Sequence, residues 1–115
     1  MPTQDEKRIA FLGDSIRVIT AFPEPAKQRM GFELSLLQLG DVPTDFKPMK
    51  SIGAGVFEVR VSAEGQAFRC FYVAKYEEAI YVLHAFEKKT RRTATRDVDV
   101  GRARYKALLR ERGRP

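Results

Sequence analysis

Cysteine and long apolar runs are scarce in this sequence of 115 residues. The single cysteine, Cys70, has no partner within the chain, which excludes a disulfide framework and a metal site built from several cysteines. No apolar run approaches the roughly 18 residues that a membrane-spanning helix needs. The N-terminal segment MPTQDEKR is polar and contains acidic residues, unlike a secretory signal. We therefore expect a cytoplasmic protein that is not bound to a membrane.

Internal repeats and low-complexity segments are also missing, and the length is that of one domain. Apolar residues make up 43% of the chain and include eight Phe and four Tyr, which is enough for the core of a two-layer fold. The sequence therefore predicts a single domain over residues 1–115.

Charge is present but unevenly distributed along the chain. Residues 1–57 carry seven Lys or Arg and seven Asp or Glu. Residues 58–115 carry fourteen Lys or Arg and eight Asp or Glu, so they account for the whole net charge of +6. A basic field confined to one half of a small protein favours an anionic partner, and nucleic acid is the leading candidate. A solvated basic tail is the alternative interpretation.

Two helices are predicted after a short first strand, or extended segment, at residues 7–14. Residues 15–22 predict the first helix, for which Asp14 or Ser15 can provide a capping side chain. Residues 25–41 predict the second, because apolar side chains recur on one helical face at Ala26, Met30, Leu34 and Leu37. The prolines and glycines that follow predict a loop.

Three strands and a last helix are predicted in the second half. Residues 56–62, 67–75 and 80–88 are joined by short turns and predict an antiparallel meander. Residues 97–113 predict a C-terminal helix whose inward side chains are Val100, Ala103 and Ala107. The predicted fold class is α+β: an N-terminal strand or extended segment, a helix hairpin, a three-stranded meander and a C-terminal helix, with the helices on one face of the sheet.

Alternation along these strands predicts that polar side chains gather on one face of the sheet. Phe57, Val59 and Val61 would face the helices, so their neighbours would face away. If Tyr81 and Leu83 also pack on the helices, the opposite face collects one set of side chains. That set is Glu58, Arg60, Arg69, His84, Phe86 and Lys88.

These residue types suit the cleavage of RNA without a metal ion. Arg60, Arg69 and Lys88 can hold the scissile phosphate and stabilise the charge that develops on it. Glu58 or His84 can transfer the proton of the ribose 2′-hydroxyl as a general acid or base. The candidate catalytic residues are Glu58, Arg60, Arg69, His84 and Lys88, and no cofactor is expected.

Other residues can bind the RNA chain around the cleavage position. An exposed aromatic ring can stack on a base, and the cations after the third strand can contact phosphates. The candidate RNA-binding residues are Lys50, Phe86, Lys89, Arg91, Arg92 and Arg96. Simpler interpretations are His84 as a hydrogen-bonded core residue, Phe86 as a core residue and Arg60 as half of a cross-strand ion pair.

Three stretches of the sequence resemble a known family: FKPMKSIGAGVFEVRV, FRCFYVAKYEEAIYVLHAFEKKT and RDVDVGRARY. They are similar to the phage-derived HigB-like branch of the RelE/ParE toxin superfamily, over roughly residues 9–109. The resemblance implies a RelE-like fold and a type II toxin that a protein antitoxin neutralises, often a helix-turn-helix repressor. It also implies a metal-independent endoribonuclease that cleaves mRNA on the ribosome.

Motif by motif, the resemblance implies roles for residues of the three strands. Arg60 matches a basic position of the first strand, and Arg69 matches the arginine of the middle strand. Lys88 and Lys89 match the basic pair that ends the last strand, and His84 matches the histidine of the LHAF motif. RelE-like sequences often carry a tyrosine after that pair, where this chain has threonines. The general base therefore stays open among His84, the glutamate of the first strand and a lysine.

Two other functions stay open beside the nuclease. ParE-like relatives share the fold and inhibit DNA gyrase, and a fold by itself does not determine the target. The other alternative is a catalytically degenerate toxin that only binds its antitoxin.

Overall fold

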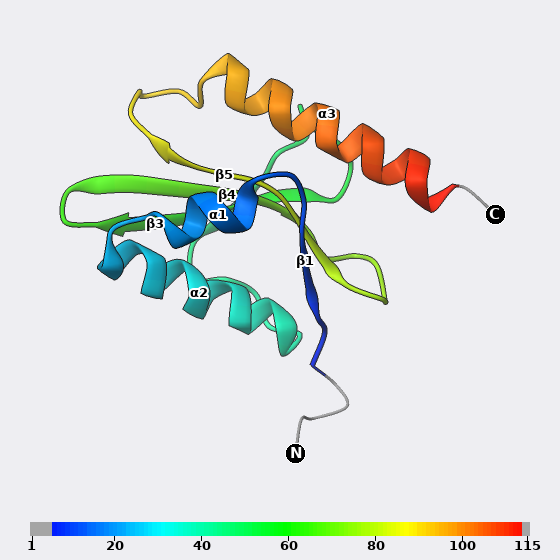
Figure 1. Ribbon diagram of the computed structural model, residues 1–115, viewed down its shortest axis with the longest axis horizontal. Coiled ribbons are helices and arrows are strands. Elements are labelled where there is room, and N and C mark those ends of the chain that lie inside the picture. Colours follow the sequence, from blue (N-terminus) through cyan, green and yellow to red (C-terminus); the bar gives the residue numbers. More distant parts are fainter. Residues whose placement is uncertain (1–5, 114–115) are drawn as a thin grey trace.

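The computed structural model describes residues 6–113, so both ends of the predicted domain, residues 1–5 and 114–115, lie outside the described residues. It contains both helices and strands (Figure 1). In chain order they are β1 (Ile9–Phe11), α1 (Ser15–Thr20), α2 (Glu24–Gln38), β2 (Phe46–Pro48), β3 (Val56–Ala63), β4 (Gln66–Val73), β5 (Ile80–Lys88) and α3 (Thr95–Arg112). The predicted α+β class, with a helix hairpin before a meander and a helix after it, is confirmed.

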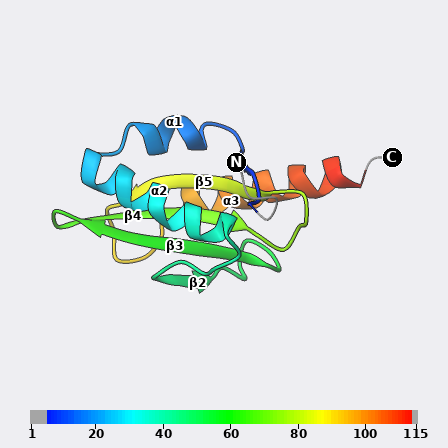
Figure 2. The ribbon, with the colours of Figure 1, turned by 90° about the horizontal axis from the view of Figure 1, so that it is seen from below.

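One five-stranded sheet organises the described residues, in the order β1-β5-β4-β3-β2 (Figure 2). The meander β3–β4–β5 is antiparallel as predicted, and β1 adds to it in parallel beside β5. The edge strand β2 was not predicted, because its segment contains Pro48. A proline lacks a backbone N–H, but an edge strand can accommodate it. The β3–β4 turn uses positive φ angles at Glu64 and Gly65, as a tight two-residue hairpin requires.

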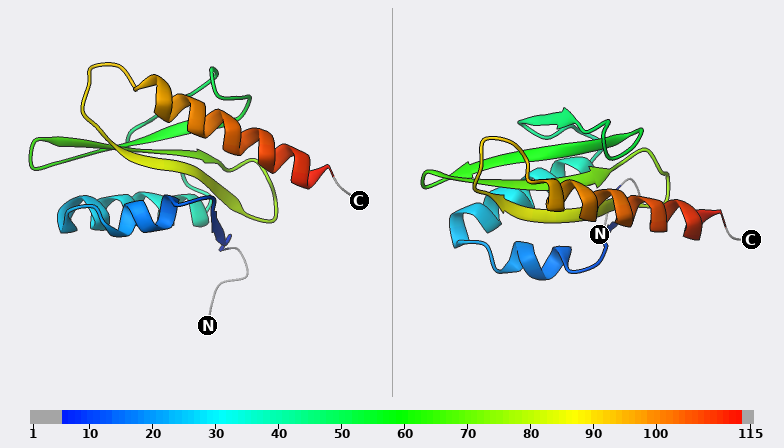
Figure 3. Two further views of the ribbon diagram at one scale, coloured as in Figure 1. Left: turned by 45° about the horizontal axis from the view of Figure 1, so that its top comes forward. Right: turned by 90° about the horizontal axis from the view of Figure 1, so that it is seen from above.

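The helices cover both faces of the sheet, so the prediction that all pack on one face is wrong. Figure 3 shows the α1–α2 hairpin on one side of the sheet and α3 on the other. Regular alternation along β3 and β4 already places Val56, Phe71 and Val73 under α3. In β5 the pattern also shifts, since Phe71 pairs with His84 but Tyr72 pairs with Val82. The extra residue, Leu83, forms a β-bulge, which breaks the strict alternation of faces.

The first core lies between the sheet and the α1–α2 hairpin. The predicted apolar face of α2 is buried there against Val59 and Val61 of β3, as expected. From β5, the side chains of Ile80, Val82 and Ala85 join this cluster. The expectation that Tyr81 and Leu83 pack on this hairpin is therefore wrong.

The second core lies under α3. Leu83 is buried there with Phe71, and Tyr81 packs against the same cluster. Tyr105 and Leu108 are the apolar side chains that α3 buries. The predicted inward residues Val100, Ala103 and Ala107 instead lie half-buried or exposed. The face of α3 that packs on the sheet differs from the predicted face, because its buried residues include Gly101, Tyr105 and Leu108. The spacing of apolar residues alone does not indicate this face.

The start of α1 also differs from the prediction. Asp14 occupies the N-cap position, but no side chain there bonds to the helix. Its carboxylate instead accepts a hydrogen bond from Arg104 of α3 at 3.0 Å. Asp14 thus ties α1 to α3 across the edge of the sheet.

Candidate active site

The face of the sheet under α3 is covered over only part of its length. Asp97 is the first buried residue of α3, and its carboxylate reaches His84 in β5. Two rows of paired residues lie further along the strands, toward the β3–β4 turn. They are the rows Arg60–Arg69–Phe86 and Ser62–Ala67–Lys88. The structure therefore brings Arg60, Arg69 and Lys88 of three strands onto one face beyond the first turn of α3, whereas Glu58 and His84 share the row next to that turn.

Two arginines are direct cross-strand neighbours in this group. Arg60 of β3 pairs with Arg69 of β4, and like charges at such positions repel. Arg69 is only 7% exposed, and its pKa is lowered, chiefly by burial and further by Arg60. Acidic residues offset the repulsion: the Arg69 Nε lies 3.7 Å from Glu58 Oε1, and the Arg60 Nε lies 3.9 Å from Asp45 Oδ2.

Glu58 lies beneath the arginines as a buried counter-charge. Its side chain is 1% exposed, and one of its oxygens, Oε2, has no hydrogen-bond partner. The Lys47 Nζ lies 4.0 Å from Oε1, because Lys47 of β2 pairs with Glu58 in the sheet. Sequence reasoning missed Lys47, since its segment was predicted to be a loop. The alternation of Phe46, Lys47 and Pro48 was the available signal.

Lys88 completes the cation cluster from the end of β5. Its pKa is lowered, first by burial and then by the positive charge of Arg69, with smaller contributions from Lys47 and Arg60. Its ammonium group donates a hydrogen bond to the backbone carbonyl of Arg91 at 2.7 Å. We define the cation cluster as Lys47, Arg60, Arg69 and Lys88.

His84 has the core environment that was the simpler interpretation of this residue. It is 9% exposed, and its Nε2 lies 2.8 Å from Asp97 Oδ1. Its ring stacks on Phe86, with centroids 5.2 Å apart and an angle of 21° between the planes. The other ring nitrogen, Nδ1, is buried and has no partner. His84 thus joins β5 to the first turn of α3 and supports the ring of Phe86.

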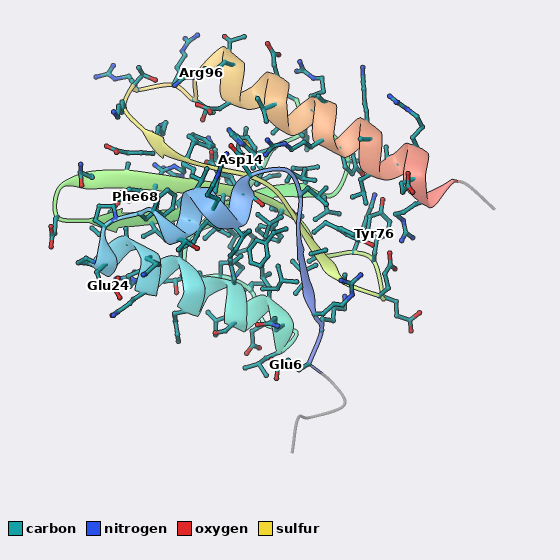
Figure 4. All side chains as sticks on the ribbon, in the orientation of Figure 1. Glu6, Asp14, Glu24, Phe68, Tyr76 and Arg96 are labelled. Carbon is teal, nitrogen blue, oxygen red and sulfur yellow. The ribbon has the colours of Figure 1, made fainter. Side chains whose placement is uncertain are left out.

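The remaining predicted RNA contacts divide into two groups. Lys89, Arg91, Arg92 and Arg96 are exposed in and just after the β5–α3 loop, and Figure 4 marks Arg96 at the start of α3. Lys50 lies elsewhere. It follows Met49, whose backbone N–H donates a hydrogen bond to the carbonyl of Val56 at the start of β3. Val56 lies about 13 Å along that strand from Arg60. The structure does not bring Lys50 to the cation cluster.

Other chemistries have few side chains available in the described part of the chain. Residues 6–113 contain no group of three or more His, Cys, Asp or Glu side chains placed to hold a metal ion. Cys70 is a free thiol in the first core, where burial raises its pKa to about 12. None of the helices described is both long and apolar enough to cross a membrane.

The sheet, its two helical layers and the cation cluster on one face define a small α+β protein, compatible with the RelE-like fold. Residues 17–106 match the family described as phage derived protein Gp49-like (DUF891), and the chain belongs to this family. Gp49-like proteins are members of the RelE/ParE-like toxin superfamily. Membership is consistent with a toxin of a toxin–antitoxin system in general, and it suggests an antitoxin as partner. No curated protein matches the chain.

Proposed function

We propose that this protein is a HigB-like toxin of a type II toxin–antitoxin system and a metal-independent endoribonuclease that cleaves mRNA on the ribosome. The observation that carries the proposal is the direct pairing of Arg60 with Arg69, beside Phe86 and Lys88 on the same face. The cognate antitoxin would be a helix-turn-helix repressor, and the toxin would act in the cytoplasm.

A phosphate group fits the paired arginines for an electrostatic reason. Two guanidinium groups on opposed strands repel each other, and the pKa of Arg69 stays lowered although Glu58 and Asp45 lie nearby, so a further anion bound between the arginines would be favourable. Arginine also matches the geometry of phosphate with two parallel hydrogen bonds. The scissile phosphate would therefore lie over Arg60 and Arg69, where charge that develops during cleavage is stabilised.

Cleavage then needs a proton acceptor that can reach the ribose. The 2′-oxygen attacks the adjacent phosphorus, the bond from phosphorus to the 5′-oxygen breaks, and a 2′,3′-cyclic phosphate remains. Glu58 and His84 are buried and held by other side chains. Lys88 is more accessible, and its lowered pKa favours the neutral amine. Lys88 would accept the 2′ proton, and water would protonate the departing 5′-oxygen.

The exposed cations of the β5–α3 loop would bind the RNA chain on either side of the cleaved bond. Arg91 and Arg92 lie in this loop, and Arg96 follows in the first turn of α3. Contacts of this kind provide affinity without sequence preference. They weaken as the salt concentration rises, because the release of counterions from the RNA then contributes less to binding.

Induced expression in bacterial cells tests the proposal with Lys88→Ala and, as a matched control, Lys27→Ala. Lys27 lies on α2, across the sheet from the cation cluster. The wild type and the control should arrest growth and fragment mRNA, whereas Lys88→Ala should leave mRNA intact. Growth arrest with intact mRNA and accumulating DNA breaks would support gyrase inhibition instead. Absence of toxicity would indicate a degenerate toxin that only binds its antitoxin.

A further inference from the structure

A small pocket adjoins the cation cluster at the point where β5 passes into α3. Its volume is about 190 Å³. Phe86 and Lys88 of β5, Ala94 of the loop, and Arg96 and Asp97 of α3 contribute to its lining. Pockets for drug-sized ligands usually occupy about 300–1,000 Å³, so this smaller pocket suits a group of the size of one nucleobase, with one ring or two fused rings.

We propose that this pocket binds one nucleobase of the RNA substrate and selects bases that carry an amino group, namely adenine, cytosine or guanine. The inference rests on the proposed function, because it assigns a subsite to the same RNA chain. It adds a base preference and gives Asp97 the role of reading the base.

The position of the pocket relates it to the phosphate site. Lys88 belongs both to the pocket lining and to the cation cluster, and Phe86 pairs across the sheet with Arg69. A nucleotide whose phosphate lies over Arg69 therefore has its base within reach of the pocket. Phe86 is not the exposed ring that the sequence predicted, because it is only 7% exposed, belongs to the second core and stacks on His84. The part of its ring that remains in the pocket lining provides a small aromatic wall of fixed orientation. Aromatic walls of this kind stack on bases in proteins that bind single strands.

The carboxylate of Asp97 gives the pocket its selectivity. Its Oδ1 is engaged by His84 at 2.8 Å, and within residues 6–113 no hydrogen bond is seen to its Oδ2. An ionised carboxylate only accepts hydrogen bonds, so the oxygen that His84 leaves unused can take a donor from a ligand in place of water. The amino groups of adenine, cytosine and guanine are donors. Uracil presents a carbonyl oxygen where cytosine has its amino group, and two acceptors repel each other.

The charges around the pocket also favour a base rather than a second phosphate inside it. Two carboxylates line the pocket, those of Asp97 and Glu87, and their negative charges would repel a phosphate inside it. Lys88, Lys89 and Arg96 line the same pocket and can contact the phosphates that flank a bound base. The pocket thus combines an acceptor and an aromatic wall with cations for the backbone.

Short 2′-O-methyl oligonucleotides test the pocket without cleavage, because the 2′ nucleophile is blocked. Oligocytidine and oligouridine form a matched pair whose bases differ at position 4 in an amino group or a carbonyl oxygen. The wild type should bind oligocytidine about five- to tenfold more tightly, the effect of about one good hydrogen bond in base discrimination. Equal affinities, or no binding of either oligonucleotide, would overturn the proposal.

The variant Asp97→Asn tests which residue reads the base. Its amide oxygen can still accept from His84, while its NH₂ group replaces the free acceptor with a donor. The preference for cytidine should disappear or reverse toward uridine. Asp99→Asn is the matched control on α3, since Asp99 pairs with Arg102 and does not line the pocket. A folded Asp97→Asn protein that keeps the wild-type preference would overturn the assignment of Asp97.

This outcome is separable from the proposed function. If unmodified RNA binds with the expected base preference but is not cleaved, the nuclease proposal fails and the pocket stands. If RNA is cleaved without any base preference that depends on Asp97, the pocket proposal fails and the nuclease stands. Thermal unfolding of each variant shows whether it is folded in the assay.

Discussion

Arg69 and Glu58 form a buried pair at the base of the cation cluster. Their closest atoms are 3.7 Å apart, and both the Arg69 Nε and the Glu58 Oε2 lack a hydrogen-bond partner. Such a pair contributes little net stability, but removing one member leaves an uncompensated charge in the interior. The pair therefore serves to hold a guanidinium group at the surface of the sheet rather than to stabilise the fold.

A double-mutant cycle tests this arrangement. Glu58→Met alone should lower the free energy of unfolding by about 3 kcal/mol, because Arg69 stays charged and loses its counter-charge. The double variant Glu58→Met/Arg69→Met should recover most of that loss, since two apolar side chains then replace the buried ions. Urea unfolding measures both values. Additive losses from the single substitutions would contradict a coupled pair.

Lys88 has a separate prediction, because its role requires that it lose a proton. Lys88→Arg keeps the positive charge, but an arginine is not deprotonated in proteins. RNA affinity should stay near the wild-type value, whereas kcat should fall by about 10²–10⁴. Single-turnover cleavage with measured RNA binding distinguishes the two effects. Lys27→Arg on α2 is the control, and full cleavage by Lys88→Arg would limit Lys88 to an electrostatic role.

The pH dependence of cleavage follows from the lowered pKa of Lys88. The neutral amine is the active form of a base, so the rate should rise with pH. It should level off at a pH below 10.5, the usual pKa of a lysine, because burial and Arg69 favour the neutral amine. A rate profile measured across the alkaline range checks this. A rate that falls over that range would contradict Lys88 as the base.

At the scale of single residues, alternation along the strands was sufficient to place Arg60, Arg69 and Phe86 on one face. Lys47 and Asp97 could not be placed in this way. Lys47 depends on a three-residue edge strand, and Asp97 depends on where α3 crosses the sheet. Both contacts depend on how separate elements are placed in space. Local alternation could have indicated the short strand that carries Lys47, but not its neighbour in the sheet.

The bulge in β5 determines how the elements around the site are arranged. By adding Leu83, it turns both Leu83 and His84 toward α3, so this helix has an apolar surface and a polar anchor beneath it. Strict alternation placed Leu83 on the side of the α1–α2 hairpin, and the register shift moves it to the side of α3, where Phe71 and Val73 of β4 also lie. A bulge has no clear signature in one sequence, which explains why the class of fold was predictable and the placement of α3 was not.

Two glycines in helices should respond in opposite ways to substitution by alanine. A Cβ at Gly101 of α3 would lie 2.8 Å from the Phe71 ring and 3.1 Å from Ile52, whereas a Cβ at Gly31 of α2 would meet no atom within 4 Å. Gly101→Ala should therefore destabilise the protein by about 1–3 kcal/mol through overpacking. Gly31→Ala should stabilise it by about 0.5–1 kcal/mol through higher helix propensity.

Urea unfolding of the two alanine variants gives the comparison directly. The opposite signs are the essential result, because both substitutions add the same methyl group to a helix. If Gly101→Ala is neutral or stabilising, α3 does not approach the sheet as closely as its buried glycine indicates.

Over the whole molecule, the excess positive charge of residues 58–115 divides between two regions, the end of the sheet beside the β5–α3 loop and the part of α3 beyond its first turn. The strands β3, β4 and β5 contribute Arg60, Arg69 and Lys88, and the β5–α3 loop adds exposed cations beside them. The apolar strand β5 ends in a run of cations because it passes there from a covered region into an exposed loop. The strand is apolar where α1 and α3 pack on it, and basic residues follow where neither helix covers it.

Salt dependence measures how many phosphates this surface contacts. For single-stranded RNA, the logarithm of the binding constant should fall with the logarithm of salt concentration by about 0.7 for each phosphate neutralised. Replacing both Arg91 and Arg92 by alanine should therefore reduce the slope by about 1.4. Arg29→Ala on α2 should leave it unchanged. An unaltered slope in the double variant would show that the loop does not contact the RNA.

The most direct test of the central claim is the sequencing of RNA ends in a purified translation system that contains one defined mRNA. With wild-type protein, cleavage should produce fragments with 2′,3′-cyclic phosphate and 5′-hydroxyl ends, and the same fragments should form with Lys27→Ala but not with Lys88→Ala. Intact mRNA in the presence of folded wild-type protein, or equal cleavage by Lys88→Ala, would contradict the assignment of the cation cluster as a ribonuclease site.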